Sequence, residues 1–97
     1  MNIPYFRPSI GSEEIKAVTS CLESGWLTSG FKCIEFEKSF KSFLETSNYS
    51  LTVNSNTSGL HLALEALGIK EGDEVITSNL TFTATAEVIK HVGATPI

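Results

Sequence analysis

The chain has 97 residues and a formal net charge of −4, and its seven basic residues are scattered along it. A hydrophobic fraction of 41% and a near-neutral mean hydropathy fit one small globular domain and argue against disorder. The scattered charge provides no basic stripe for a nucleic-acid partner, and no apolar run reaches the roughly 18 residues that cross a membrane.

The first half of the chain is expected to form two helices joined by a loop. After an extended, proline-containing lead-in, the first helix takes Ser12 as its N-cap and runs to Glu23, and Gly25 is placed to stop it. The loop 25–30 carries the chain's only Trp. The second helix spans 31–45 with an apolar stripe at helical spacing. That stripe comprises Cys33, Phe36, Phe40, Phe43 and Leu44.

The second half alternates between expected strands and helices. The strands are 50–53, 74–77 and a third that opens at Thr95, and the helices between them are 57–67 and 82–92. Short links between alternating elements predict parallel strand pairs, so the fold class is α/β, two helices followed by β-α-β-α-β. The first of these two helices is apolar nearly all the way round, which predicts burial on several sides. Because the chain stops inside the third strand, we expect it to be part of a larger domain.

The turn that enters the helix at 57–67 is rich in small polar residues. A helix start leaves N–H groups unpaired, and with the helix dipole they form a site suited to a phosphate. Asn56 can adopt a left-handed backbone conformation at modest cost, and the hydroxyls of Ser55, Thr57 and Ser58 can add donors. Ordinary N-capping by the same residues is the alternative explanation.

A second turn, at 78–85, occupies the equivalent place after the next strand. Ligands of open α/β sheets gather beyond the carboxyl ends of the strands, where both turns are expected to lie. Phe82 can present its flat face to a planar ring held by the first turn, or it can belong to the core.

The cysteines and histidines do not indicate a metal site. Cys21 and Cys33 have no CxxC spacing and fall on apolar helix faces, which predicts buried, reduced thiols. His61 is expected to be a buried structural histidine, and His91 to lie at a helix C-terminus where its charge is favourable. Reduced thiols and the absence of a signal-peptide pattern favour a cytoplasmic location.

Six segments carry a resemblance to a known family. They are Pro4–Gly11, Ser24–Gly30, Leu60–Leu64, Gly68–Ile76, Leu80–Thr85 and Gly93–Pro96. In this order they resemble the DegT/DnrJ/EryC1/StrS aminotransferases, which use pyridoxal 5′-phosphate (PLP) to transfer an amino group, usually from glutamate, to a keto group of a nucleotide-linked sugar. The resemblance implies the aspartate-aminotransferase-like fold (fold type I) and a homodimer, with residues 1–97 forming the N-terminal segment of the PLP-binding large domain.

The same resemblance implies roles for individual residues. The backbone at Asn56, Thr57 and Ser58 would bind the PLP phosphate, and Phe82 would stack on the pyridine ring. The sugar-nucleotide side of the site would be lined by Tyr5, Gly25, Trp26, Leu27 and Thr28. The family usually has Ser-Gly-Thr-Ala where this chain has Ser-Asn-Thr-Ser at positions 55–58, so the geometry of the phosphate turn is expected to differ in detail.

Catalysis by residues 1–97 alone is not expected. In the family, the Schiff-base lysine and the acidic partner of the pyridine nitrogen both lie beyond position 97. Two alternatives to a sugar aminotransferase stay open. Some relatives carry histidine in place of the lysine and act as PLP-dependent sugar dehydratases, and the chain can also be a non-catalytic fragment or interaction module.

Overall fold

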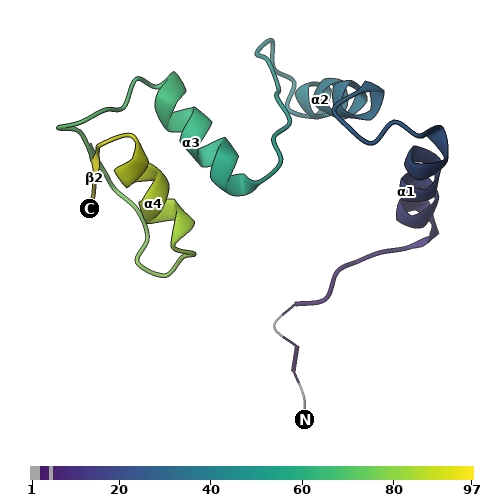
Figure 1. Cartoon of the computed structure of the whole chain (residues 1–97), viewed down its shortest axis with the longest axis horizontal. Coiled ribbons are helices and arrows are strands. Elements are labelled where there is room, and N and C mark those ends of the chain that lie inside the picture. Colours follow the sequence, from purple (N-terminus) through teal and green to yellow (C-terminus); the bar gives the residue numbers. More distant parts are fainter. Residues whose placement is uncertain (1–2, 5) are drawn as a thin grey trace. The chain divides into compact units, whose positions relative to one another are not determined.

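The structure, a computed structural model, describes residues 3–4 and 6–97. These residues form four helices and two short strands in the order α1, α2, α3, β1, α4, β2 (Figure 1). The chain divides into two compact units, Met1–Ser50 and Leu51–Ile97, which are described separately below. Tyr5, expected to line the substrate site, lies outside the described residues.

The first helix, α1 (Ser12–Ser24), begins and ends at glycines. Its N-cap is Gly11 and not Ser12, because the Glu14 carboxylate reaches back and accepts the Gly11 N–H over 2.6 Å. This is the acidic half of a capping box, and it satisfies one of the unpaired donors at the helix start. At the other end Gly25 adopts φ +71°, the left-handed conformation that ends a helix, as predicted.

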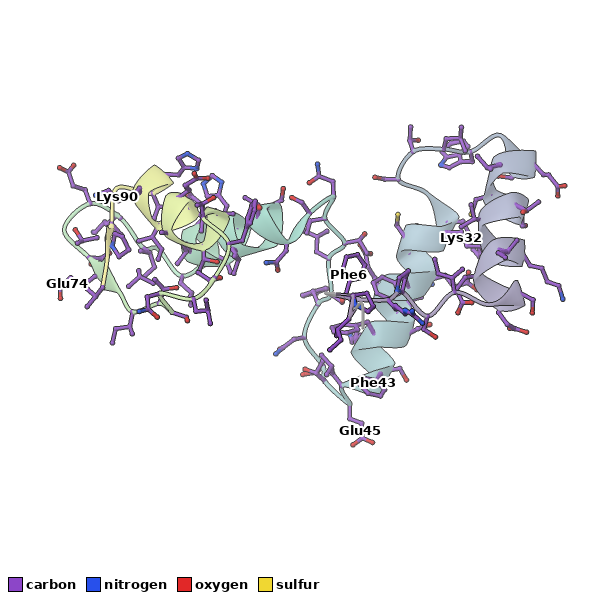
Figure 2. The ribbon with its side chains drawn as sticks, turned by 90° about the horizontal axis from the view of Figure 1, so that it is seen from below. Phe6, Lys32, Phe43, Glu45, Glu74 and Lys90 are labelled. Atoms are coloured by element: carbon purple, nitrogen blue, oxygen red, sulfur yellow. The ribbon has the colours of Figure 1, made fainter. Side chains whose placement is uncertain are left out.

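The second helix, α2 (Phe31–Phe43), ends two residues earlier than expected. The Glu45 N–H donates to Ser42 O over 3.1 Å and the Thr46 N–H donates to Lys41 O over 3.4 Å. This pair of bonds is the Schellman pattern, which requires a left-handed residue between them. Glu45 takes that position at φ +50°, just beyond Phe43 (Figure 2).

The unit Leu51–Ile97 contains α3 (Asn56–Ala66), β1 (Glu74–Val75), α4 (Ala84–His91) and β2 (Thr95–Pro96). β1 and β2 pair in parallel with α4 between them in sequence, as expected for a β-α-β unit. The predicted strand at 50–53 is wrong, since the sheet of the described residues contains only β1 and β2. A strand requires a neighbour to pair with, and local alternation of side chains does not supply one.

The core of this unit is small and lies between α4 and the residues that follow it. Val88, Ile89 and Ala94 are each at most 2% exposed, and Leu60 and Leu64 of α3 pack against them. α3 itself has no buried residue, so the prediction of burial on several sides is wrong for the described chain. The reason is that α4 covers a single face of α3, while the leucines on the other faces are exposed.

Candidate functional site

The start of α3 is built by hydrogen bonds among three polar side chains. Ser55 is the N-cap, with φ −159° and ψ 158°, and its hydroxyl accepts the Ser58 N–H over 3.1 Å. The Ser58 hydroxyl donates to Asn54 Oδ1 over 2.8 Å and lies 2.9 Å from the Ser55 hydroxyl. The two serine hydroxyls are therefore already paired within the turn, as the N-capping alternative predicts.

Two backbone donors at the same helix start have no such partner. Within the described chain, no hydrogen bond involves the N–H groups of Asn56 and Thr57, whose side chains are exposed. They are the first two N–H groups of α3, and the positive end of the helix dipole lies with them. Asn56 is helical and does not use the left-handed conformation open to asparagine, because the turn is completed by the extended Ser55. The arrangement suits an anion such as a phosphate group.

The turn before α4 lies beyond the carboxyl ends of the two strands. α3 and α4 pack side by side, and their starts lie toward the same end of the unit (Figure 1). A hollow of about 340 Å³ is found here. It is lined by Thr77, Ser78, Asn79, Thr81, Thr83, Ala86, Pro96 and Ile97. The position agrees with the rule that ligands collect at this edge of an α/β sheet.

Phe82 lies in this turn, two residues before α4, and not inside the helix as predicted. The side chain is 80% exposed, which excludes the alternative that it belongs to the core of its own unit. The exposed ring offers a flat apolar face to a ligand or to another part of the protein.

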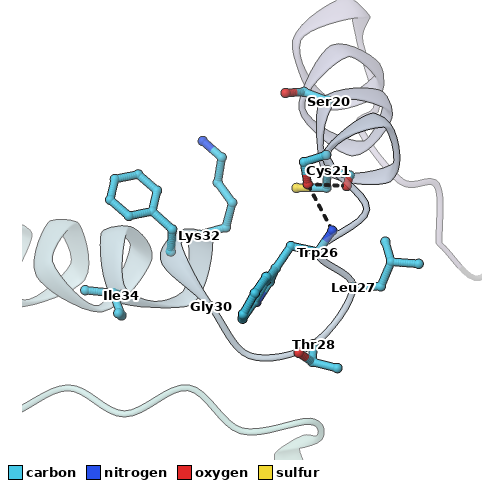
Figure 3. A pocket seen from close by; sticks show the side chains of 10 residues that line it. Ser20, Cys21, Trp26, Leu27, Thr28, Gly30, Lys32 and Ile34 are labelled. Atoms are coloured by element: carbon cyan, nitrogen blue, oxygen red, sulfur yellow. Dashed lines mark hydrogen bonds between the residues drawn. The ribbon is translucent and has the colours of Figure 1, made fainter.

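The other expected group of site residues lies in the unit Met1–Ser50. Trp26, Leu27 and Thr28 line a pocket of about 740 Å³ between the end of α1 and the start of α2 (Figure 3). Gly25, the C-cap of α1, leads into this loop but is not among the residues that line the pocket. The pocket also includes residues that the sequence did not indicate, because the helix ends that bear them meet only in the folded chain. These are Ser20, Cys21, Ser24, Gly30, Phe31, Lys32 and Ile34.

One charged pair borders this pocket. The Lys32 ammonium lies 2.9 Å from the Glu35 carboxylate, one turn further along α2. The hydrogen bond and the charge of Glu35 raise the pKa of Lys32, so the two groups form an exposed ion pair beside the pocket at neutral pH.

The cysteines and histidines differ from the sequence prediction in their burial. Cys21 and Cys33 are free thiols, and both are half-buried because the apolar stripe of each helix has little packed against it. His61 is also half-buried, with its Nε2 atom 3.5 Å from the Glu65 carboxylate and its ring 6.0 Å from that of His91. Among the residues that the structure describes, no three acidic, Cys or His side chains gather as metal ligands, and no helix is long and apolar enough to span a bilayer.

Comparison with known proteins identifies the class to which this fold and site belong. The sequence model of the DegT/DnrJ/EryC1/StrS aminotransferase family matches residues 8–97. The chain therefore belongs to this family, as its motifs predicted.

Individual relatives agree with the family assignment. The chain is 55% identical over 95 residues to the spore coat polysaccharide biosynthesis protein SpsC of Bacillus subtilis, covering 98% of this chain and 24% of that protein. It superposes with TM-score 0.85 and 42% identity on the PMP-form of the putative sugar aminotransferase Spr1654 of Streptococcus pneumoniae, over all of this chain and 24% of that one. A GDP-4-keto-6-deoxy-D-mannose-3-dehydratase of Escherichia coli with bound hydrated PLP superposes with TM-score 0.84 at 26% identity, over 98% of this chain and 26% of that one.

These relatives confirm the predicted fold and cofactor, and they show how much of a whole enzyme the chain represents. The predicted fold type I, an α/β fold, is confirmed, and the cofactor prediction agrees with the PMP- and PLP-forms in which the pneumococcal enzyme has been solved. The chain spans about a quarter of the length of the relatives it matches. Reaction, substrate and assembly are thus properties of proteins about four times as long.

Proposed function

We propose that residues 1–97 form the N-terminal segment of the large domain of a PLP-dependent sugar aminotransferase. The acceptor is a nucleotide-linked keto sugar, the amino donor is glutamate, and the enzyme is a cytoplasmic homodimer. Family membership supports the reaction class, and the likeness to a spore coat polysaccharide biosynthesis protein supports a sugar substrate. The chain supplies binding groups, while the lysine that carries the cofactor belongs to a later part of the enzyme. Residues 1–97 alone are therefore inactive.

The start of α3 is the observation on which the cofactor assignment depends. The free N–H groups of Asn56 and Thr57 are suited to the dianionic PLP phosphate, with the helix dipole adding to the attraction. Ser58 stabilises the turn, because its N–H donates to the Ser55 hydroxyl and its own hydroxyl donates to Asn54 Oδ1. Phe82, exposed beyond the strand ends, covers one face of the pyridine ring. When bound, PLP supplies the electron sink that an amino-group transfer requires.

The loop that contains Gly25, Trp26, Leu27 and Thr28 is assigned to the sugar-nucleotide side of the site, together with Tyr5. The pocket beside this loop has apolar walls, and at its edge lies Lys32, whose ammonium forms an ion pair with Glu35. Such a lining fits a ligand with a planar or apolar part and an anionic part, as a nucleotide-linked sugar has.

The reaction is tested on the full-length enzyme with PLP, glutamate and a keto-sugar nucleotide. Glutamate should convert PLP to PMP, which absorbance follows, and mass spectrometry of the sugar should then find an added amino group. A sugar that has lost a hydroxyl and gained no nitrogen would identify a dehydratase, the alternative favoured by the likeness to the E. coli enzyme. A protein that binds no PLP at all would contradict both activities.

The phosphate site is tested by a change that removes one N–H and leaves the helix intact. Asn56 is the first residue of α3, where proline is well tolerated, and Ser55 before it has the extended conformation that proline requires. We expect Asn56→Pro to weaken PLP binding at least tenfold, the order of one charge-assisted hydrogen bond, with unchanged thermal stability. Asn56→Ala keeps the N–H and is the matched control. Equal PLP affinity in the two variants would contradict the backbone assignment.

A further inference from the structure

The Trp26 indole lies directly against the backbone of Gly30 (Figure 3). A Cβ atom built on Gly30 would come 2.5 Å from Trp26 Cδ1 and closer still to Nε1, far inside the distance at which non-bonded carbon atoms attract. The indole N–H donates to Ser29 O over 3.2 Å, which holds the edge of the ring at this place. Any side chain on residue 30 therefore competes with the indole for the same space.

The backbone does not explain why residue 30 is glycine. Gly30 has φ −164° and ψ −151°, an extended conformation that other residues adopt, unlike Gly25 with its left-handed φ of +71°. Gly30 is also the N-cap of α2, where Ser, Thr, Asp and Asn are generally preferred to glycine. Space for the indole is the feature that only glycine provides here.

We infer that Gly30 is a positioning residue for the sugar substrate: its missing side chain provides the seat for Trp26. The inference rests on the proposed function, in which this loop faces the sugar nucleotide. Trp26 joins both ends of the loop, because its backbone N–H donates to the Ser24 hydroxyl over 3.2 Å while its ring rests on Gly30. Leu27 and Thr28 lie between these two anchors and line the pocket, so the seated indole sets their position.

Gly30→Ser distinguishes the proposed role of Gly30 in positioning Trp26 from ordinary helix capping. Capping preferences predict a neutral or stabilising effect of serine at this position, whereas the seat predicts that serine displaces the indole. Gly11→Ser is the matched control, since Gly11 is also an extended N-cap and its added Cβ would meet only the flexible end of Glu14 at 3.3 Å. In the full-length enzyme with ¹⁵N-labelled Trp, the Trp26 indole resonance should shift in Gly30→Ser and stay unchanged in Gly11→Ser. Trp26→Phe identifies that resonance by its loss.

A double variant keeps the inference testable if Gly30→Ser lowers stability. Once the indole is absent, serine at position 30 has nothing to displace. Gly30→Ser should therefore lower the melting temperature of the enzyme with Trp26, and leave it unchanged or raise it in the Trp26→Ala background. An equal loss of melting temperature in both backgrounds, or an indole resonance that does not shift, would overturn the inference that Gly30 positions Trp26.

Kinetics separate this inference from the proposed function. Gly30→Ser should raise KM for the sugar nucleotide several-fold, while the half-reaction with glutamate proceeds at the parental rate, because only sugar binding depends on the loop. A displaced indole with unchanged KM would overturn the positioning role. Failure of the parental enzyme to react with glutamate or the sugar would instead overturn the proposed function. The resonance and melting experiments would still decide whether Gly30 holds the Trp26 indole in place.

Discussion

At the scale of single residues, Glu45 has a left-handed backbone conformation that is unfavourable for a residue with a side chain. Its φ of +50° is one that residues with a Cβ adopt at a cost of roughly 1–2 kcal/mol, and an acidic group here also faces the negative end of the α2 dipole. We expect Glu45→Gly to raise the free energy of unfolding of the full-length enzyme by about 1 kcal/mol, measured by urea denaturation. Glu45→Ala removes the charge and keeps the Cβ, so it should gain less. Equal gains would assign the effect to charge and contradict the backbone argument.

At the scale of elements, the start of α1 depends on a carboxylate in the capping box. The Gly11 N–H donates to Glu14, and this hydrogen bond is the main reason that the pKa of Glu14 lies below its ordinary value of 4.5. Because the folded form has the lower pKa, the stabilisation is complete above about pH 4.5 and is lost as the pH falls through the folded pKa. We expect the Gly11 amide resonance to titrate with a midpoint below 4.5.

Two variants test whether Glu14 is the group responsible. Glu14→Gln should abolish the titration of the Gly11 amide while preserving α1, since glutamine also completes a capping box. Glu13→Gln is the matched control, because within the described residues Glu13 makes no bond to the Gly11 N–H. A midpoint at or above 4.5, or a titration that persists without the Glu14 carboxylate, would contradict this account of the helix start.

At the scale of the whole molecule, few of the apolar side chains are covered. Among the described residues, the buried core consists of Ala84, Val88, Ile89 and Ala94, while large apolar residues on every helix except α4 are exposed. A chain of this size is marginal even when well packed, because small domains bury a modest fraction of their surface. We expect residues 1–97 produced alone to be poorly soluble or to melt without cooperativity, as followed by calorimetry and circular dichroism. A soluble monomer with one sharp transition would contradict this prediction.

Trp26 gives a second prediction at this scale, concerning assembly. The Trp26 side chain is 66% exposed and the neighbouring Leu27 is exposed to a similar degree, so neither is buried in the core of its own unit. Large aromatic residues on loops are favoured at buried contacts with a partner or ligand. Trp26→Ala in the full-length enzyme should weaken the proposed homodimer in sedimentation experiments or raise KM for the proposed sugar-nucleotide substrate. Unchanged association and KM with a lowered melting temperature would instead assign Trp26 to the fold of its own subunit.

The sequence by itself determined those features that depend on local spacing. Helical periodicity predicted all four helices to within two residues at each end, and glycine chemistry placed the end of α1 at Gly25. The order of motifs along the chain determined the family, and therefore the fold type, before any contact was known. The start of α3 was predicted as the anion site because unpaired N–H groups are a property of every helix start.

Only the tertiary structure decided which groups are paired and which are free. The sequence left open whether the hydroxyls of Ser55 and Ser58 face a ligand or cap the helix, and the folded turn pairs them with each other and with Asn54, leaving backbone N–H groups as the available donors. Periodicity likewise made α3 apolar on all sides, whereas contact with α4 covers just one of them. The close approach of Trp26 to Gly30 also depends on the path of the loop in space. Pairing and burial are relations between residues brought together by folding, and composition and spacing do not contain them.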